Sequence, residues 1–191
     1  VAWLGGVDGS DPAAGSLFVA PAGAGGARNL TGAREETCVA LAFLPDGKLA
    51  ATCVQGTRTA AWRVDPGTGD RVPLVAAGAA AFTGLSLSRD GRRLAFAGST
   101  ASHPPDVFVG APGEAPRRLV NSNPQLEGLP RAAQEIMRFK ASDGLEIEGV
   151  LIRPQAFREG RRWPLVVLAH GGPESQYLDA WHNSYSDPGQ A

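Results

Sequence analysis

The chain has 191 residues, of which 43% are hydrophobic and 19% charged, a composition typical of a globular protein with a core. Its formal net charge is -1, which argues against a partner attracted by a basic surface, such as nucleic acid or an anionic membrane. The sequence contains no run of about 18 apolar residues, so no membrane-spanning helix is expected. The 25 glycines and 15 prolines predict many turns, at a level below that which suggests disorder.

Two early segments of the chain repeat one pattern. Residues 41–50 and 85–95 each contain an apolar run, an Asp-Gly pair, basic residues and a second apolar run. Asp-Gly between alternating apolar residues is the strongest short-range signal for a β-hairpin, because glycine tolerates the positive φ of such turns. The two aspartates, at positions 46 and 90, are 44 residues apart.

The same offset recurs in short apolar segments that are each followed by a Gly/Pro turn and a closing run. A repeat of about 40–50 residues with several short strands is typical of propeller blades, which bury both faces of each sheet. We therefore expect residues 1–120 to form about two and a half blades of a β-propeller, with further blades upstream. A β-sandwich is the alternative, and the fixed offset favours the propeller. The apolar segments are 16–21, 60–65 and 106–111, and their closing runs are 28–31, 71–75 and 117–120.

The pattern changes near residue 121. Residues 121–134 are polar and interrupted by proline, as linkers between domains are. A further Asp-Gly pair at Asp143 predicts another hairpin, and residues 164–169 form an apolar run typical of a strand buried on both faces of a parallel sheet. The expected fold is mixed: the C-terminal blades of a β-propeller, followed in residues 135–191 by the first strands of an α/β-hydrolase domain.

The apolar run ends in His170-Gly171-Gly172-Pro173. In α/β-hydrolases the loop after the third strand carries a motif of the HGGG type, which supplies a backbone N–H to the oxyanion hole. That donor stabilises the negative charge of the tetrahedral intermediate in acyl transfer. Gly171 is therefore the candidate catalytic donor, and His170, Gly172 and Pro173 are its candidate supporting loop. The alternative is a simple tight turn after a strand.

The order of these parts resembles the prolyl oligopeptidase family, and within it the acylaminoacyl-peptidase-like bacterial branch. Residues 138–154 resemble the start of the family's hydrolase domain, residues 170–174 its oxyanion loop, and residues 181–190 the segment that follows. The resemblance implies a serine peptidase whose propeller restricts access, and whose substrates are oligopeptides or acyl-peptides. It places the nucleophile in a later Gly-x-Ser-x-Gly-Gly elbow, followed by Asp and His.

None of these triad elements is found in the chain, which begins at Val1 rather than Met and ends in a loop-like stretch. We therefore expect a fragment that is inactive by itself. Ser175 lacks the Gly-x-Ser-x-Gly elbow that exposes a nucleophile. His170 precedes any nucleophile and is expected to hold the loop rather than to act as a base.

Two other functions stay open: a non-catalytic propeller scaffold that binds proteins, and an esterase with an appended propeller. No metal or other cofactor is expected, because the three histidines and two cysteines lack the spacing of a zinc site. Cleavage specificity and oligomeric state are not determined by the sequence, and a cytoplasmic location is favoured over a secreted or periplasmic one.

The two cysteines, Cys38 and Cys53, lie at similar distances on either side of the turn at Asp46. They are therefore predicted to be neighbours across one hairpin. We expect two free thiols that pack as small buried hydrophobes, without a disulfide.

Overall fold

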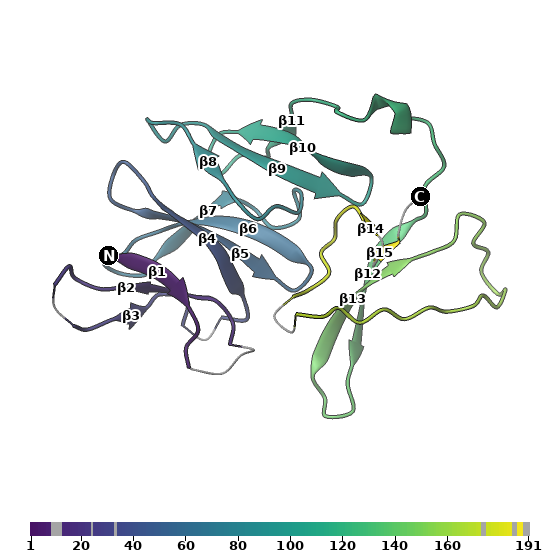
Figure 1. The fold of residues 1–191 in the computed structure, drawn as a ribbon, viewed down its shortest axis with the longest axis horizontal. Coiled ribbons are helices and arrows are strands. Elements are labelled where there is room, and N and C mark those ends of the chain that lie inside the picture. Colours follow the sequence, from purple (N-terminus) through teal and green to yellow (C-terminus); the bar gives the residue numbers. More distant parts are fainter. Residues whose placement is uncertain (9–12, 24, 33, 173–174, 185–186, 189–191) are drawn as a thin grey trace.

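The computed structural model describes residues 1–191 with the exception of 9–12, 24, 33, 173–174, 185–186 and 189–191 (Figure 1). The described residues form strands β1 to β15 and one short 3-10 helix, with no α-helix among them. No helix of the described part is long and apolar enough to cross a membrane.

Three antiparallel sheets follow one another along residues 1–118, and we call them the first, second and third blades. Within each blade, strands that are adjacent in sequence are paired. The first blade has three described strands and the other two have four each, in the order of the chain. The first blade contains β1 (Ala2–Gly5), β2 (Ser16–Val19) and β3 (Arg28–Asn29). The second contains β4 (Thr37–Phe43), β5 (Leu49–Gln55), β6 (Arg58–Val64) and β7 (Arg71–Val75), and the third β8 (Ser86–Leu87), β9 (Leu94–Thr100), β10 (His103–Gly110) and β11 (Arg117–Arg118).

The repeat found in the sequence corresponds to equivalent strands in successive blades. The segments beginning near residues 16, 60 and 106 are the strands β2, β6 and β10, and their closing runs are β3, β7 and β11. The Asp-Gly pairs form the turns between β4 and β5 and between β8 and β9. In each turn the aspartate side chain accepts a hydrogen bond from the backbone N–H two residues later, Lys48 at 3.1 Å from Asp46 and Arg92 at 3.0 Å from Asp90. The propeller part of the predicted fold is confirmed.

Two apolar cores form between neighbouring blades. One contains residues of the first and second blades, including Leu17, Leu49 and Val64. The other joins the second and third blades, where the rings of Phe82, Phe96 and Phe108 stack in series. The strand β5 is buried along nearly its whole length because a blade covers each of its faces. This burial on both sides explains why its sequence is apolar at successive positions instead of alternating.

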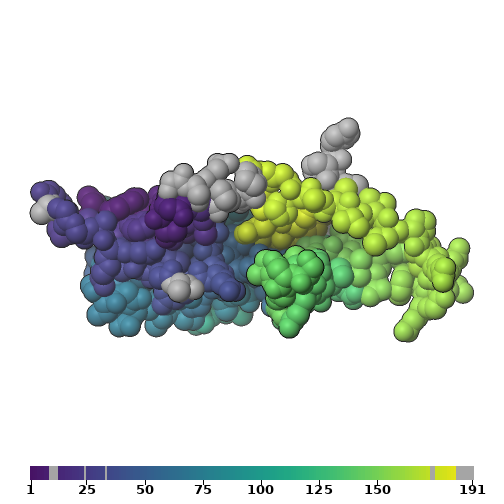
Figure 2. Space-filling view, turned by 90° about the horizontal axis from the view of Figure 1, so that it is seen from below, coloured from purple at the N-terminus to yellow at the C-terminus, as the bar shows by residue number. Residues whose placement is uncertain are grey.

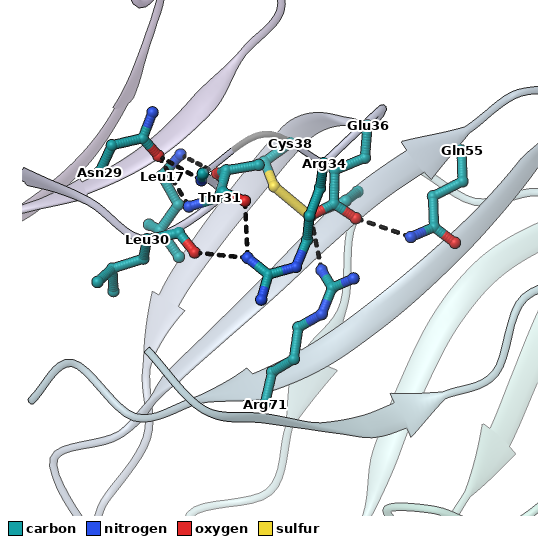
Figure 3. Close-up of a disulfide and its surroundings, with 11 residues drawn as sticks. Leu17, Asn29, Leu30, Thr31, Arg34, Glu36, Cys38, Gln55 and Arg71 are labelled. Carbon is teal, nitrogen blue, oxygen red and sulfur yellow. Dashed lines mark hydrogen bonds and ion pairs between the residues drawn. A yellow bond between two sulfur atoms is a disulfide. The ribbon is translucent and has the colours of Figure 1, made fainter. Parts of the chain in front are cut away.

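The prediction that Cys38 and Cys53 are cross-strand neighbours is right, and the prediction that they are free thiols is wrong. They are paired in the β4–β5 register and joined by a disulfide, with Cα atoms 3.8 Å apart (Figure 3). The N–H of Cys38 points away from β5 and donates to the carbonyl of Gly15 at 2.7 Å. The two cysteines therefore form a non-hydrogen-bonded pair, the type in which opposite side chains come closest. The spacing of the two cysteines in the sequence predicted that they lie close together. It did not predict that they form a non-hydrogen-bonded pair.

After the third blade the chain passes through a 3-10 helix, Pro124–Leu126, and enters an antiparallel hairpin. Strand β12 (Gln134–Lys140) pairs along its whole length with β13 (Glu146–Ile152), and the predicted Asp-Gly pair forms the turn between them. The short strands β14 (Asn183–Ser184) and β15 (Asp187–Pro188) pair near the end of the chain. The β12–β13 hairpin and the segment before β14 lie against the ends of the blades (Figures 1 and 2).

The strand predicted over residues 164–169 does not form in this structure. Leu165, Val166 and Val167 are 75%, 78% and 79% exposed, and no hydrogen bond joins the backbone of residues 164–172 to another described residue. A strand of a parallel sheet needs backbone partners at its edges and apolar layers on both faces. The described residues offer neither, so this segment is unpaired. The remaining elements match the expected order of blades followed by the start of a hydrolase domain.

Candidate functional site

The predicted donor segment His170–Gly172 is exposed, and Pro173 lies outside the described residues. The N–H of Gly171 has no hydrogen-bond acceptor among the described residues, and a Cβ at this position would meet nothing within 4 Å. Gly172 has a φ of +141°, which side chains disfavour. The segment thus has a conformation that depends on glycine at Gly172, and at Gly171 an exposed residue whose N–H is unpaired among the described residues. The catalytic role of Gly171 stays a prediction.

His170 is linked to the residues that follow through aromatic contacts. Its ring meets Tyr177 edge-on at 5.8 Å between ring centroids, and Tyr177 meets His182 edge-on at 5.7 Å. His182 is buried, at 5% exposure, and its Nε2 lies 2.8 Å from the carbonyl oxygen of Leu178. The three rings hold the donor segment and residues 177–182 together. The structural role expected for His170 stays a prediction.

Residues 177–182 are attached to the second and third blades. The backbone N–H of Asp179 donates to the carbonyl of Thr57 at 2.7 Å, in the turn between β5 and β6. The Asp179 carboxylate accepts from Gln134 Nε2 of β12 at 2.8 Å. The backbone N–H of Trp181 lies 3.5 Å from Ser99 Oγ of β9. The segment next to the donor is thus held by both the blades and the β12–β13 hairpin.

A carboxylate of the hairpin reaches the same turn. Oε2 of Glu148 accepts from the backbone N–H of Thr57 at 2.9 Å and from its hydroxyl at 3.1 Å. The other carboxylate oxygen is held by the guanidinium of Arg138 at 2.8 and 2.6 Å. Hydrogen bonding to Arg138, together with the Thr57 N–H, lowers the pKa of Glu148. Glu148 is therefore a charged acceptor between the hairpin and the second blade.

Sequence reasoning missed Thr57 and Glu148. Glu148 lies in a Leu-Glu-Ile-Glu alternation, where a glutamate is expected to face solvent, and its neighbour Glu146 does so with a side chain 62% exposed. The one local signal was Gly56, whose φ of +56° marks a turn that requires glycine. No pattern in the sequence indicated which residue would fill the space beside that turn.

A cavity of about 170 Å³ lies next to this contact, and its lining includes Arg58, Ser102 and Asp179. Two larger cavities, of about 550 and 580 Å³, are lined by residues of the blades and the loops between them, and none of their lining residues comes from beyond Leu119. Of these three cavities, the small one at the Thr57 turn is the one lined by a described residue of the C-terminal segment, Asp179.

Two other places in the chain hold residue types that could carry chemistry, Ser175 and the cluster around Glu36. Ser175 is exposed, and no strand-to-helix elbow surrounds it among the described residues. Glu36, Cys38 and Cys53 place possible metal-ligating atoms within 4.8 Å of one another, but the two sulfur atoms are bonded to each other. The Glu36 carboxylate is occupied by Gln55 Nε2 at 2.7 Å and by the guanidinium of Arg71 at 2.6 Å (Figure 3). This cluster stabilises the second blade.

No family profile matches the chain. Individual relatives do. It is 30% identical over 142 residues to the acylamino-acid-releasing enzyme of Sus scrofa, which covers 66% of this chain and 19% of that protein. It is 29% identical over 59 residues to dipeptidyl-peptidase 5 of Schizosaccharomyces pombe, which covers 31% of this chain and 9% of that protein.

Solved structures share the fold. The acylaminoacyl peptidase of Pyrococcus horikoshii superposes on 86% of this chain, and on 25% of its own, with a TM-score of 0.66 at 23% identity. Dipeptidyl peptidase 4 of Porphyromonas gingivalis covers 98% of this chain and 27% of its own with a TM-score of 0.72 at 18% identity. These matches include both the blades and the segment that follows them.

The chain belongs to the prolyl oligopeptidase family. Its curated relatives are named acylamino-acid-releasing enzyme and dipeptidyl-peptidase 5, which agrees with the resemblance found in the sequence. It spans between 9% and 19% of the length of the two curated relatives described above. The structural neighbours combine a propeller with a hydrolase domain, and the three blades agree with the propeller, while the boundary between the two parts in this chain stays a prediction.

Proposed function

We propose that the protein containing this chain is a serine peptidase that hydrolyses short peptides or acyl-peptides through an acyl-enzyme. The observation that carries the proposal is the exposed His170–Gly172 segment, with a Gly171 N–H that has no acceptor among the described residues. In a member of this family, such a donor after the blades suits the binding of an oxyanion.

The chemistry that Gly171 would serve is acyl transfer. A serine oxygen attacks the carbonyl carbon of the scissile bond and gives its proton to a histidine, and the carbonyl oxygen becomes negatively charged. The Gly171 N–H donates to that oxygen in the transition state. Collapse of the intermediate expels the amine, which takes the proton from the histidine, and water then releases the acyl group by the reverse sequence. We expect the serine, histidine and aspartate to lie beyond residue 191.

The names of the relatives narrow the substrate class. The acylamino-acid-releasing enzymes suggest a blocked amino terminus, and the dipeptidyl-peptidases suggest a free one. Both kinds of substrate would be short peptides that are cleaved near the amino end. A propeller beside the site would restrict access to substrates of this size, as the family resemblance implies.

The test uses the complete protein. It is incubated with an acetyl-amino-acid anilide, a dipeptidyl anilide, a prolyl peptide anilide and a nitrophenyl ester, and separately with a fluorophosphonate that labels active serines. Anilide cleavage that is abolished by the label supports the proposal. Ester hydrolysis without anilide cleavage would favour the esterase, and absence of both labelling and hydrolysis would favour the scaffold.

A further inference from the structure

The turn Gly56–Thr57 between β5 and β6, which we call the anchor turn, directs its polar groups toward the part of the chain that follows the blades. Thr57 is 4% exposed, and its N–H and hydroxyl donate to Glu148 while its carbonyl accepts from Asp179. A buried blade residue thus binds both the β13 strand and the segment beside the donor loop. Burial makes each of these hydrogen bonds costly to lose, because water cannot replace the missing partner.

The shape of the anchor turn is suited to a carboxylate. Gly56 has a φ of +56°, and a Cβ placed there would lie 2.2 Å from Oε2 of Glu148. Glycine is therefore required at this position for two reasons, the backbone conformation and the close approach of the carboxylate. Arg138 fixes that carboxylate from the opposite side at 2.6 Å.

Contacts continue from the anchor turn to the donor segment. The Thr57 carbonyl holds the backbone of Asp179, which directly follows Leu178, and the carbonyl of Leu178 lies 2.8 Å from the His182 ring. His182 contacts Tyr177, and Tyr177 contacts His170, the residue before Gly171. Each step is a direct contact between neighbouring groups, so a displaced Asp179 would shift the rings that hold His170.

We propose that the anchor turn and Glu148 are positioning elements for the oxyanion donor, so that a blade of the propeller sets the geometry of the catalytic loop. This inference rests on the proposed function. Neither Thr57 nor Glu148 is required to touch the substrate. Their effect acts through the placement of residues 170–172 and 175–182, and misplacement by about 1 Å costs up to about 100-fold in rate.

The test compares Glu148→Ala with Glu146→Ala in the complete protein. Glu146 lies on the same strand and is a matched control, since its ion pair, 3.8 Å from Arg138, stays within the hairpin. Glu148→Ala should lower kcat by about 10- to 100-fold with KM nearly unchanged, because a displaced donor affects the transition state most. Glu148→Gln keeps an oxygen that can accept from Thr57 and should recover much of the rate. Rates are expressed per fluorophosphonate-labelled serine, so that unfolded protein does not count.

A second pair of variants serves if Glu148→Ala folds poorly. Gly56→Ala and Gly47→Ala both place a side chain at a positive φ, +56° and +78°, but only the first meets Glu148, since a Cβ at Gly47 has nothing within 4 Å. The extra loss of kcat in Gly56→Ala over Gly47→Ala measures the anchor itself. Amide hydrogen exchange at Asp179 gives a readout independent of turnover and should accelerate in Glu148→Ala.

The outcomes separate the two proposals. An active wild type in which Glu148→Ala and Glu146→Ala have the same kcat and the same exchange at Asp179 would overturn this inference alone. A wild type with neither hydrolysis nor serine labelling would overturn the proposed function. The positioning role proposed for the anchor turn and Glu148 would then be overturned as well. A Glu148→Ala variant that raises KM at constant kcat would also contradict a positioning role.

Discussion

Gly171 combines three properties that allow its backbone N–H to be tested by substitution. Its N–H has no acceptor among the described residues, and a Cβ added to it would meet nothing within 4 Å. Its φ is outside the positive range that side chains disfavour. A side chain can therefore be added at this position with little steric cost, while proline removes the donor itself.

The first prediction is that Gly171→Pro lowers kcat of the complete protein by about 100- to 1,000-fold, the usual cost of losing one oxyanion donor. Gly171→Ala keeps the N–H and should lose far less. Steady-state kinetics on the best anilide substrate measure both variants, and binding of a substrate-like peptide checks that the loop is intact. Equal rates for the two variants would remove Gly171 from the oxyanion hole.

Asp106 holds the start of the linker on the third blade. Its carboxylate is buried and accepts from the backbone N–H of Ser122 at 2.9 Å and from Nε of Arg118 at 2.6 Å. Hydrogen bonds from Ser122, followed by the contribution of Arg118, lower the pKa of Asp106 from its ordinary value of 3.8 to about 2. The ionised carboxylate thus stabilises the folded state at every pH above its unfolded pKa, and this contribution disappears as pH falls from about 4 to 2.

The second prediction follows from the lowered pKa of Asp106, which makes the folded state more stable above pH 4 than near pH 2. Asp106→Asn should unfold at lower urea than wild type at pH 6, and the two proteins should converge as the pH approaches 2. Asp143→Asn, in an exposed turn, is the control and should change the urea midpoint little. A constant difference between wild type and Asp106→Asn from pH 6 to pH 2 would refute the role of the charge.

At the scale of the element, the second blade is held by a covalent bond as well as by packing. The disulfide joins β4 to β5 within an apolar core, and the buried Glu36 carboxylate beside it binds β7 through Arg71 at 2.6 Å. Arg71 also stacks over Trp62 of β6, 4.0 Å from its ring centroid. All four strands of this blade are thus tied together, and it is the blade that contains the anchor turn.

The third prediction is that reduction of the disulfide lowers the free energy of unfolding by about 3 kcal/mol, the entropy expected for a closed loop of about 15 residues. Urea unfolding with and without dithiothreitol measures it. A Cys38→Ala/Cys53→Ala double variant should show no effect of the reductant. Disulfides persist mainly in oxidising compartments, so counting free thiols in freshly isolated protein also bears on the cytoplasmic location, which stays a prediction.

At the scale of the whole molecule, the chain contains the predicted donor segment and the residues that contact it, and no Gly-x-Ser-x-Gly motif that would mark a nucleophile. A donor alone has no covalent step to assist. The fourth prediction is that the 191-residue chain hydrolyses neither acyl-peptide anilides nor nitrophenyl esters above background. Hydrolysis that is lost in Ser175→Ala would show that Ser175 is the nucleophile and that the division into blades and a partial hydrolase domain is wrong.

The blades could be predicted from the sequence because their signals are local. An Asp-Gly turn needs one carboxylate and one positive φ within three residues. The apolar runs beside it indicate strands that are buried on both faces of their sheet. The periodic spacing of these signals then gave the propeller. The candidate donor segment has a local signal too, an apolar run that ends in His170-Gly171-Gly172, and its role stays a prediction.

Tertiary structure alone decided which distant groups meet. Glu148 and Thr57 are 91 residues apart, and nothing in the alternation around Glu148 distinguished it from the exposed Glu146. The bond between Cys38 and Cys53 depended on the hydrogen-bonding register of β4 and β5. Residues 164–169 have the sequence of a buried strand, but a strand exists only where other strands and apolar layers cover it, and burial and pairing are properties of the neighbours rather than of the segment.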